Sequence, residues 1–302
     1  MIALSTAWVP KRSARLAKVL AAGRRIGFTS FELGVSDVPF DLDAVRKAID
    51  RRGIRIVSIH AVCCEGGVPG PTRRGDWVAE PDEARRRHGV RLVRETLDIA
   101  RRVGATAVVL HGGVLPVPDL REYQIELYRL MSRGADTGHL QKPLQRLLEQ
   151  RARMAPAYLR ALEASLEELC GYAPDVRIGL ENRYYLSDLP HRDEFEAVFD
   201  RVSAPNLGYW HDVGHAHLIE RLGFADQLEW LGRYADRLVG IHLHDIRGVE
   251  DHRPPGTGDF NFAALTDYLR PDVLRVLEIA SGHSARAVRK SRDHLAEMYG
   301  IA

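Results

Sequence analysis

Cysteine and long apolar runs are scarce in this chain, and each shortage excludes a class of protein. The 302 residues include three cysteines, the adjacent Cys63 and Cys64 and the distant Cys170. This is not the even, spaced set that cross-links small secreted domains, so a cytoplasmic location is expected. No stretch reaches the roughly 18 apolar residues of a membrane span, and the first residues do not have the pattern of a signal peptide. The sequence therefore predicts a protein without membrane association.

The chain also has little excess of either charge. Its 43 basic and 41 acidic residues leave a net charge of +2. A protein that binds a polyanion through its overall field usually has a larger basic surplus, so nucleic acid is not the expected partner. A small-molecule substrate is the simpler expectation, and a homo-oligomer stays compatible with this composition.

Apolar runs of strand length alternate with amphipathic stretches of helix length along the whole chain. This alternation is typical of a parallel sheet closed by crossover helices, and the length suits one (β/α)8 TIM-barrel domain spanning residues 1–302. The expected strands are Ile2–Trp8, Ser30–Leu33, Ile54–His60, Ala107–His111, Val176–Glu181, Leu207–Asp212, Leu238–His242 and Val273–Glu278.

Helices are expected between these strands, with terminal residues that suit them. Asp41 and the pair Pro81-Asp82 can begin helices, while Gly53 and Gly104 stand where left-handed C-caps are needed. The expected helices are Ser13–Arg25, Asp41–Arg52, Glu83–Val103, Met154–Leu169, Arg192–Phe199, His215–Tyr234 with a break near Gly223, Phe262–Leu269 and Ala285–Tyr299.

Two connections are longer than the others, residues 63–81 and 112–153. Both follow strand carboxyl ends, so both are expected over the active face of the barrel as lids or specificity elements. Residues 112–153 are expected to be partly helical, and they can equally decorate the rim or form a dimer contact.

Seven of the expected strands end on a side chain that can bind a divalent metal. In a TIM barrel the carboxyl ends of the strands surround one site, so ligands repeated there describe a single centre. The seven residues are Glu32, His60, His111, Glu181, Asp212, His242 and Glu278. Strand alternation places small or apolar residues such as Val109, Gly179, Trp210 and Gly240 below them, inside the barrel.

Four of these residues come from the last four strands. Glu181, Asp212, His242 and Glu278 offer three carboxylates and one imidazole, a set suited to Mn²⁺, Mg²⁺, Co²⁺ or Zn²⁺. A histidine at a strand end is more often structural than metal-binding, but four converging positions favour a metal site. Candidates for a second metal or for substrate binding are His60, His111, His215, Glu250, His252 and Arg253.

An ordered series of short motifs resembles the xylose-isomerase-like sugar phosphate isomerase/epimerase superfamily, whose fold is also that of AP endonuclease family 2. The series spans nearly the whole chain. It consists of Ser58-Ile59-His60, His111-Gly112-Gly113, Leu180-Glu181-Asn182, Asp212-Val213-Gly214-His215, His242-Leu243-His244-Asp245, Asp251-His252-Arg253-Pro254-Pro255-Gly256-Thr257-Gly258 and Leu277-Glu278.

The resemblance implies a divalent metal held by the quartet, with Glu181 and Glu278 as acid and base. The implied reaction is isomerisation or epimerisation of a sugar or sugar phosphate by proton transfer through a metal-bound enediolate. His60, His215 and an arginine such as Arg247 or Arg253 would orient hydroxyls or a phosphate, because a guanidinium binds oxyanions with two donors.

The resemblance leaves two other reactions open. An endonuclease IV type of hydrolase binds three zinc ions, and its ligand pattern is nearly filled here by the quartet with His60, His111, His215, Glu250 and His252. Glu250 departs from that pattern, in which an aspartate is expected. An inosose dehydratase-like lyase is also possible, because the same intermediate can expel a hydroxyl group. A sugar-binding barrel without catalysis is less favoured, since both glutamates are present.

Overall fold

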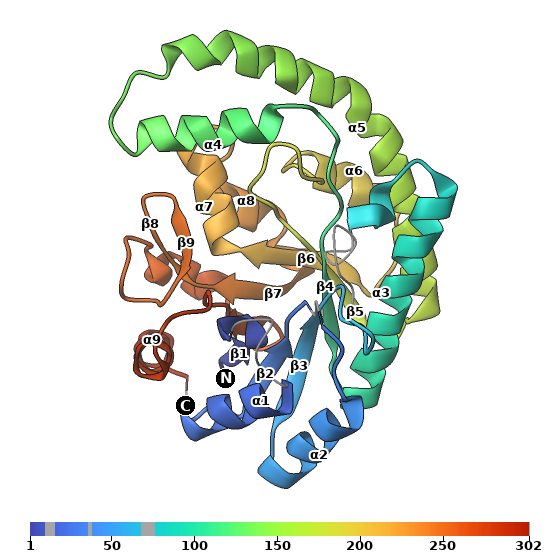
Figure 1. The fold of residues 1–302 in the computed structure, drawn as a ribbon, viewed down its shortest axis with the longest axis vertical. Helices are drawn as coiled ribbons and strands as arrows, with labels where there is room; N and C mark the ends of the chain where they lie inside the picture. The colour runs from blue at the N-terminus through green and yellow to red at the C-terminus, as the bar shows by residue number, and fades with distance from the viewer. Residues whose placement is uncertain (10–15, 36–37, 68–75, 302) are drawn as a thin grey trace.

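The strands form a closed parallel barrel surrounded by helices, as the alternating sequence pattern predicts (Figure 1). The computed structural model describes residues 1–9, 16–35, 38–67 and 76–301. The barrel order is β1-β10-β7-β6-β5-β4-β3-β2, so the first and last barrel strands close the sheet. Its strands are β1 (Ala3–Ser5), β2 (Ser30–Leu33), β3 (Arg55–His60), β4 (Ala107–Leu110), β5 (Arg177–Glu181), β6 (Leu207–Asp212), β7 (Leu238–Leu243) and β10 (Leu274–Leu277).

Helices cover the outside of the barrel, and a short hairpin stands at its rim. The α-helices are α1 (Leu16–Arg25), α2 (Leu42–Arg52), α3 (Glu83–Val103), α4 (Leu120–Met131), α5 (Gly138–Tyr172), α6 (Glu194–Arg201), α7 (Val213–Arg221), α8 (Gln227–Arg233) and α9 (Ala285–Met298). The 3-10 helices are η1 (Thr6–Trp8), η3 (Asp76–Ala79), η4 (Ala235–Arg237) and η5 (Phe262–Tyr268), and the antiparallel hairpin pairs β8 (Asp245–Arg247) with β9 (Glu250–Arg253).

The predicted helix ends are confirmed where the local chemistry is simple. Asp41 and Asp82 accept hydrogen bonds from backbone amides three residues ahead and so cap α2 and α3. Gly53 and Gly104 end these helices in the left-handed conformation. Gly223, at φ +78°, lies between α7 and α8 and produces the expected break.

Two predicted elements differ from the structure, and a third lies partly outside the described residues. The first strand ends at Ser5, because the Ser5 hydroxyl accepts a hydrogen bond from the Ala7 amide and starts η1. Residues 112–153 are mainly helical. They contain α4 and the first half of α5, a 35-residue helix that runs through Pro143 and Pro156 (Figure 1). Of the other long connection, residues 63–81, positions 68–75 lie outside the described residues.

The interior of the barrel is filled around one tryptophan. Trp210 is fully buried among small and aliphatic side chains, and its ring occupies space that neighbouring strands leave by carrying glycine. A β-carbon at Gly240 would lie 2.5 Å from the Trp210 ring, and one at Gly179 would lie 2.9 Å from it. The predicted inward set therefore forms a packed floor below the polar rim.

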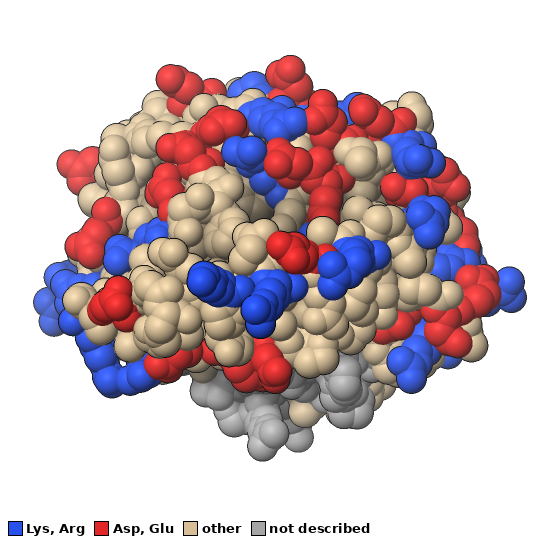
Figure 2. Space-filling view, turned by 90° about the horizontal axis from the view of Figure 1, so that it is seen from above, with Lys and Arg blue, Asp and Glu red and all other residues tan. Residues whose placement is uncertain are grey.

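No helix among the described residues is long and apolar enough to cross a membrane. On the face shown in Figure 2, basic and acidic side chains are interspersed around a central hollow, in keeping with the small net charge.

Candidate metal centre

The quartet predicted from the sequence meets at the carboxyl end of the barrel. Glu181, Asp212, His242 and Glu278 each offer one ligand atom, and these atoms all lie within 4.8 Å of one another. The side chains come from β5, β6 and β7 and from the residue after β10. All four are buried, with Glu278 the most accessible at 9 %.

His242 lies at the centre of this group. Its Nδ1 atom is 2.8 Å from Glu181 Oε1, 3.1 Å from Glu278 Oε2 and 3.6 Å from Asp212 Oδ2. Its other ring nitrogen, Nε2, is 3.2 Å from both carboxylate oxygens of Glu32. One side of the ring thus faces the three carboxylates, and the other side is held by a fourth.

Glu32 therefore lies behind the centre rather than in it. It is fully buried on β2, where Ser58 of β3 donates a hydrogen bond of 2.8 Å to its Oε2 atom. A histidine that ligates a metal commonly donates its second N–H to a carboxylate, which fixes its tautomer and orientation. The sequence marked Glu32 as a possible ligand, and the geometry gives it this supporting place.

Asp212 is held by its neighbours in the chain and in space. Its carboxylate caps α7 by accepting the His215 amide, and its backbone amide donates to the Asn182 side chain at 2.6 Å. The Asn182 amide group returns a bond to the Asp212 carbonyl, and His244 Nε2 lies 3.0 Å from Asp212 Oδ1. These contacts fix the direction of the carboxylate toward His242.

Burial and the contacts described above have opposite effects on the pKa values of these groups. Burial opposes ionisation of Glu181, but the His111, His242 and His60 rings outweigh it and hold the pKa of Glu181 well below its usual range. For Asp212, His215 and His244 outweigh burial in the same way and lower the pKa. Burial opposes protonation of His242, yet Glu278 and Glu32 raise its pKa well above the usual value.

The donor set fits a divalent cation. Three carboxylates this close and this buried repel one another, and a buried charge is costly unless it is paired or bound to a metal. Hard carboxylate oxygens with one imidazole suit Mn²⁺, Mg²⁺, Co²⁺ or Zn²⁺. The residues that would hold the ion are therefore Glu181, Asp212, His242 and Glu278.

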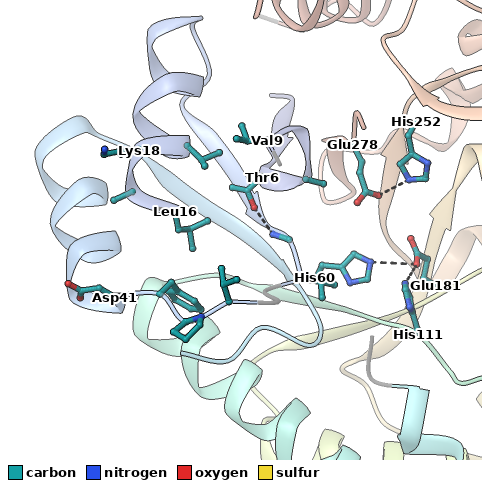
Figure 3. Close-up of a pocket in the computed structure, with 18 of the residues that line it drawn as sticks. Thr6, Val9, Leu16, Lys18, Asp41, His60, His111, Glu181, His252 and Glu278 are labelled. Atoms are coloured by element: carbon teal, nitrogen blue, oxygen red, sulfur yellow. Dashed lines mark hydrogen bonds and ion pairs between the residues drawn. The ribbon is translucent and has the colours of Figure 1, made fainter. Parts of the chain in front are cut away.

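Two further groups of metal-binding type flank the quartet. His60, His111 and Glu181 form one, and Asp212, His215 and His252 form the other, each with ligand atoms within 4.8 Å of one another. Glu181 and Asp212 are thus shared with the quartet. His111 Nε2 is 2.8 Å from Glu181 Oε2, but neither nitrogen of this buried ring has hydrogen-bond geometry with a described residue. Figure 3 shows His60 and His111 both directed at Glu181.

The second flanking group is fixed from behind. His215 Nδ1 lies 3.0 Å from the Asn182 carbonyl, and burial lowers the pKa of His215 to about 4, so the ring is neutral near pH 7. His252, at φ +52°, donates its amide to His244 Nδ1 and stacks on that ring at a centroid distance of 4.1 Å. Asp245 holds the following turn by accepting backbone amides from Gly256, Thr257 and Gly258.

Two predicted residues lie outside the centre. The Glu250 side chain is 71 % exposed and pairs with Arg253 at 2.8 Å, so the structure brings neither residue into the quartet or the lining of the cavity above it. The reason is the β8–β9 hairpin, in which adjacent residues face opposite sides. The neighbouring Asp251 contacts His252 instead, with 3.2 Å between its Oδ2 atom and His252 Nδ1. Burial raises the pKa of Asp251, but the contact with His252 outweighs burial and lowers the pKa to about 2.

Arg183, which the sequence did not single out, faces the centre. Arg183 lies two residues after Glu181, is 9 % exposed, and approaches Glu181 Oε2 at 3.1 Å. It lines the cavity above the quartet, whereas Arg247 and Arg253 do not line it. Its place directly after the Glu181-Asn182 pair was the only available signal. His244 and Asn182 belonged to quoted motifs, but nothing in the sequence indicated that both would hold Asp212.

A cavity of about 750 Å³ opens above the centre. Within the quartet, Glu181 and Glu278 line this cavity, while Asp212 and His242 lie beneath. His60, His111, His215, His252 and Arg183 complete its polar end. Among the described residues at this end, a bound molecule would therefore meet two carboxylates, several imidazoles and the Arg183 guanidinium.

Residues 20–298 match the xylose isomerase-like TIM barrel family. The chain belongs to this family. A relative from Sinorhizobium fredii (strain NBRC 101917 / NGR234), named uncharacterized protein y4fM, is 27 % identical over 237 residues, which are 75 % of this chain and 66 % of the relative. The matched part is thus just under two thirds of that relative's length.

Solved structures share the fold of this family member. A D-tagatose 3-epimerase-like protein has a TM-score of 0.71 at 19 % identity, covering 99 % of this chain and 97 % of its own. A D-allulose 3-epimerase from Methylomonas sp., in complex with D-allulose, has a TM-score of 0.70 at 16 % identity, covering 99 % and 96 %. At such identities the likeness shows the fold alone.

Proposed function

We propose that this protein is a metal-dependent sugar isomerase or epimerase that moves a proton at the carbon next to a carbonyl group. The observation that carries the proposal is the convergence of Glu181, Asp212, His242 and Glu278, with the two glutamates facing the cavity. The family and the epimerases that share its fold support the same class of reaction.

The proposal assigns each residue a task. A divalent cation in the quartet would act as a Lewis acid that stabilises negative charge on the oxygens of the reacting sugar. Glu181 and Glu278 come from strands on different sides of the site, so one can remove a proton from one face of the carbon while the other returns a proton to the opposite face. That pair of transfers inverts the carbon, whereas a single carboxylate working on one face would interconvert an aldose and a ketose.

The neighbouring side chains would orient the substrate. His215 is held by the Asn182 carbonyl through Nδ1, which leaves Nε2 for a hydroxyl group. The buried Arg183 guanidinium, which pairs with Glu181 at 3.1 Å and with Asp188 at 3.5 Å, lines the cavity and places a positive charge beside substrate oxygens. His60 and His111 approach Glu181 from the other side and favour its ionised form, the form that accepts a proton.

Proton exchange tests this proposal directly. A panel of ketoses, aldoses and their phosphates would be incubated with the metal-loaded protein in deuterated water, and deuterium at the carbon next to the carbonyl would be followed by NMR. We expect exchange with at least one compound, reduced by roughly 10²–10⁴-fold in Glu278→Gln. Glu250→Gln is the matched control, because that side chain lies outside the centre and should leave exchange unchanged. Absence of exchange with every compound would contradict the proposal.

The two flanking groups favour a second candidate, a phosphodiester hydrolase with several metals. His60 with His111, and His215 with His252, could each extend the quartet by one cation through the shared Glu181 and Asp212. Such a cluster would supply a hydroxide for attack on a phosphodiester. Cleavage of a duplex that contains an abasic site, lost in Glu278→Gln and retained in Glu250→Gln, would favour this candidate over the isomerase.

A further inference from the structure

The cavity above the metal centre is large for a simple sugar, and the described residues on one side of it are mainly apolar. It extends from the polar end across the first turns of α1 and α2 (Figure 3). Cavities of roughly 300–1,000 Å³ suit ligands of drug size, so about 750 Å³ leaves much space beyond a six-carbon sugar. We call this extension the apolar arm, and its wall includes Val9, Leu16, Val38, Pro39, Phe40 and Ala44.

Hydrogen bonds of the backbone hold the wall in place. The Gly34 amide donates to Thr6 Oγ1 at 2.8 Å and joins the loop after β1 to the loop after β2. The Phe40 amide donates to the Glu65 carbonyl at 2.9 Å, which ties the same loop to the turn after β3. Asp41 then caps α2 by accepting the Ala44 amide. The part of the wall from Phe40 to Ala44 is therefore organised before a ligand arrives, which lowers the entropic cost of binding.

The six described side chains that define the arm favour an apolar group over a hydroxyl group. They are aliphatic or aromatic, and a hydroxyl buried against them without a hydrogen-bond partner costs free energy. Val38 keeps 36 % of its surface exposed, so an apolar group that covers this wall removes apolar surface from water. The Phe40 ring and the Pro39 ring offer flat faces, which suit the edge or face of an aromatic ring. Lys18 and Asp41 mark the polar far end of the arm.

We infer that the substrate of this site is a sugar that carries an aryl substituent, with the sugar at the metal centre and the aryl group in the apolar arm. The inference rests on the proposed function for the identity of the sugar end. It adds that the reaction acts on a conjugate rather than on a free sugar.

Binding of two matched ketose ethers tests the inference without any need for turnover. 6-O-Phenyl-D-fructose and 6-O-methyl-D-fructose keep the ketose carbonyl and differ only in the substituent, and each would be titrated calorimetrically into the metal-loaded full chain. We expect the phenyl compound to bind about tenfold tighter or more, because a buried ring adds apolar contact area. Equal affinities would overturn the inference.

Two variants locate the effect. Ala44→Phe should fill the arm and remove the preference for the phenyl compound, while 6-O-methyl-D-fructose binds as before. Phe40→Ala should weaken the phenyl compound alone, and thermal melting would confirm that both variants are folded. Ile125→Phe is the matched control, since Ile125 is 49 % exposed on α4 and does not line the cavity. A phenyl preference that survives both arm variants would place the aryl group elsewhere and contradict the inference.

The outcome separates this inference from the proposed function. A phenyl preference that is lost in Ala44→Phe, without deuterium exchange in any sugar, would retain the apolar arm and reject the isomerase. Deuterium exchange in free sugars without any phenyl preference would retain the isomerase and reject the aryl conjugate.

Discussion

The two halves of the barrel end their strands in different chemistry. The half formed by β5, β6, β7 and β10 supplies the quartet Glu181, Asp212, His242 and Glu278. The half formed by β1 to β4 supplies Ser5, Glu32, His60 and His111 within one residue of its strand ends, and the loops after β1 and β2 add part of the apolar arm. One half is built to bind a cation, and the other supports those ligands and shapes the space for the substrate.

Two glutamates near the carboxyl ends of strands serve different purposes. Glu32 lies on β2, and Glu278 directly follows β10. Glu278 faces His242 Nδ1 and the cavity, whereas Glu32 contacts His242 Nε2 and is sealed under Ser58. If the halves differ in this way, losing a ligand from the cation-binding half should weaken metal binding more than losing a supporting contact from the other half.

Removal of a ligand from the cation-binding half should have the largest effect. We expect Glu278→Gln to weaken metal binding by roughly 100- to 1,000-fold. A four-ligand site with a binding free energy of about 12 kcal/mol obtains about 3 kcal/mol from each ligand. Competition against a chromophoric chelator measures this change, and Glu250→Gln serves as its control. An unchanged affinity would remove Glu278 from the ligand set.

The packed barrel interior, to which both halves contribute, should make a large contribution to the free energy of unfolding. Trp210 fills the space that Gly179 and Gly240 leave, so Trp210→Ala would open a cavity that the backbone cannot close. We expect a loss of about 3–5 kcal/mol in the free energy of unfolding, measured by urea denaturation of the metal-free protein. The partly exposed Tyr172 is a suitable comparison, since Tyr172→Ala should cost clearly less. Equal losses would contradict the packed floor.

The supporting half should tune metal binding more weakly than a ligand does. In Glu32→Gln the His242 Nε2 atom loses its carboxylate partner, and supporting contacts of this kind change metal affinity by about 10- to 100-fold. Ser58→Ala removes a contact one step further away and should have a smaller effect. If Glu32→Gln and Glu278→Gln weakened binding equally, the proposed difference between the halves would be lost.

Acid should destabilise the folded chain through His211, which strand alternation turns away from the centre. Burial lowers the pKa of this ring to about 3 from an ordinary value of 6.5, and its Nδ1 atom lies 2.8 Å from the Tyr209 hydroxyl. Between these pH values the unfolded chain binds a proton at His211 and the folded chain does not. The free energy of unfolding therefore falls as the pH drops from about 6.5 toward about 3, by about 1.4 kcal/mol per pH unit. His211→Phe should flatten this part of the curve in denaturation between pH 6.5 and 5. An unchanged slope would assign the effect to other groups.

The sequence predicted the barrel and the quartet because both follow simple periodicities. Apolar runs mark the strands, and a ligand at each strand end is brought to one mouth by the fold itself. Contacts made across the barrel could not be read in this way. The bond from His242 to Glu32 joins residues 210 positions apart, and no local pattern encodes it.

Local expectations failed where tertiary packing or a turn decided the outcome. The sequence predicted a helix over Met154–Leu169 and only partly helical structure in residues 112–153, yet α5 runs from Gly138 to Tyr172 past Pro143 and Pro156 while packing along α3 and α4. Glu250 was a candidate for a second metal or for substrate binding, but the hairpin turns it to the outside. Arg183 was overlooked because an arginine next to a predicted ligand carries no signal of its own direction.

The metal content of the purified chain tests the central claim most directly. The wild type and Asp212→Asn would be loaded with Mn²⁺ or Zn²⁺, dialysed against metal-free buffer, and analysed for metal per chain by mass spectrometry. We expect one tightly retained divalent ion in the wild type and its loss in Asp212→Asn. Equal retention in both proteins, or no retention in the wild type, would contradict a cation held by Glu181, Asp212, His242 and Glu278.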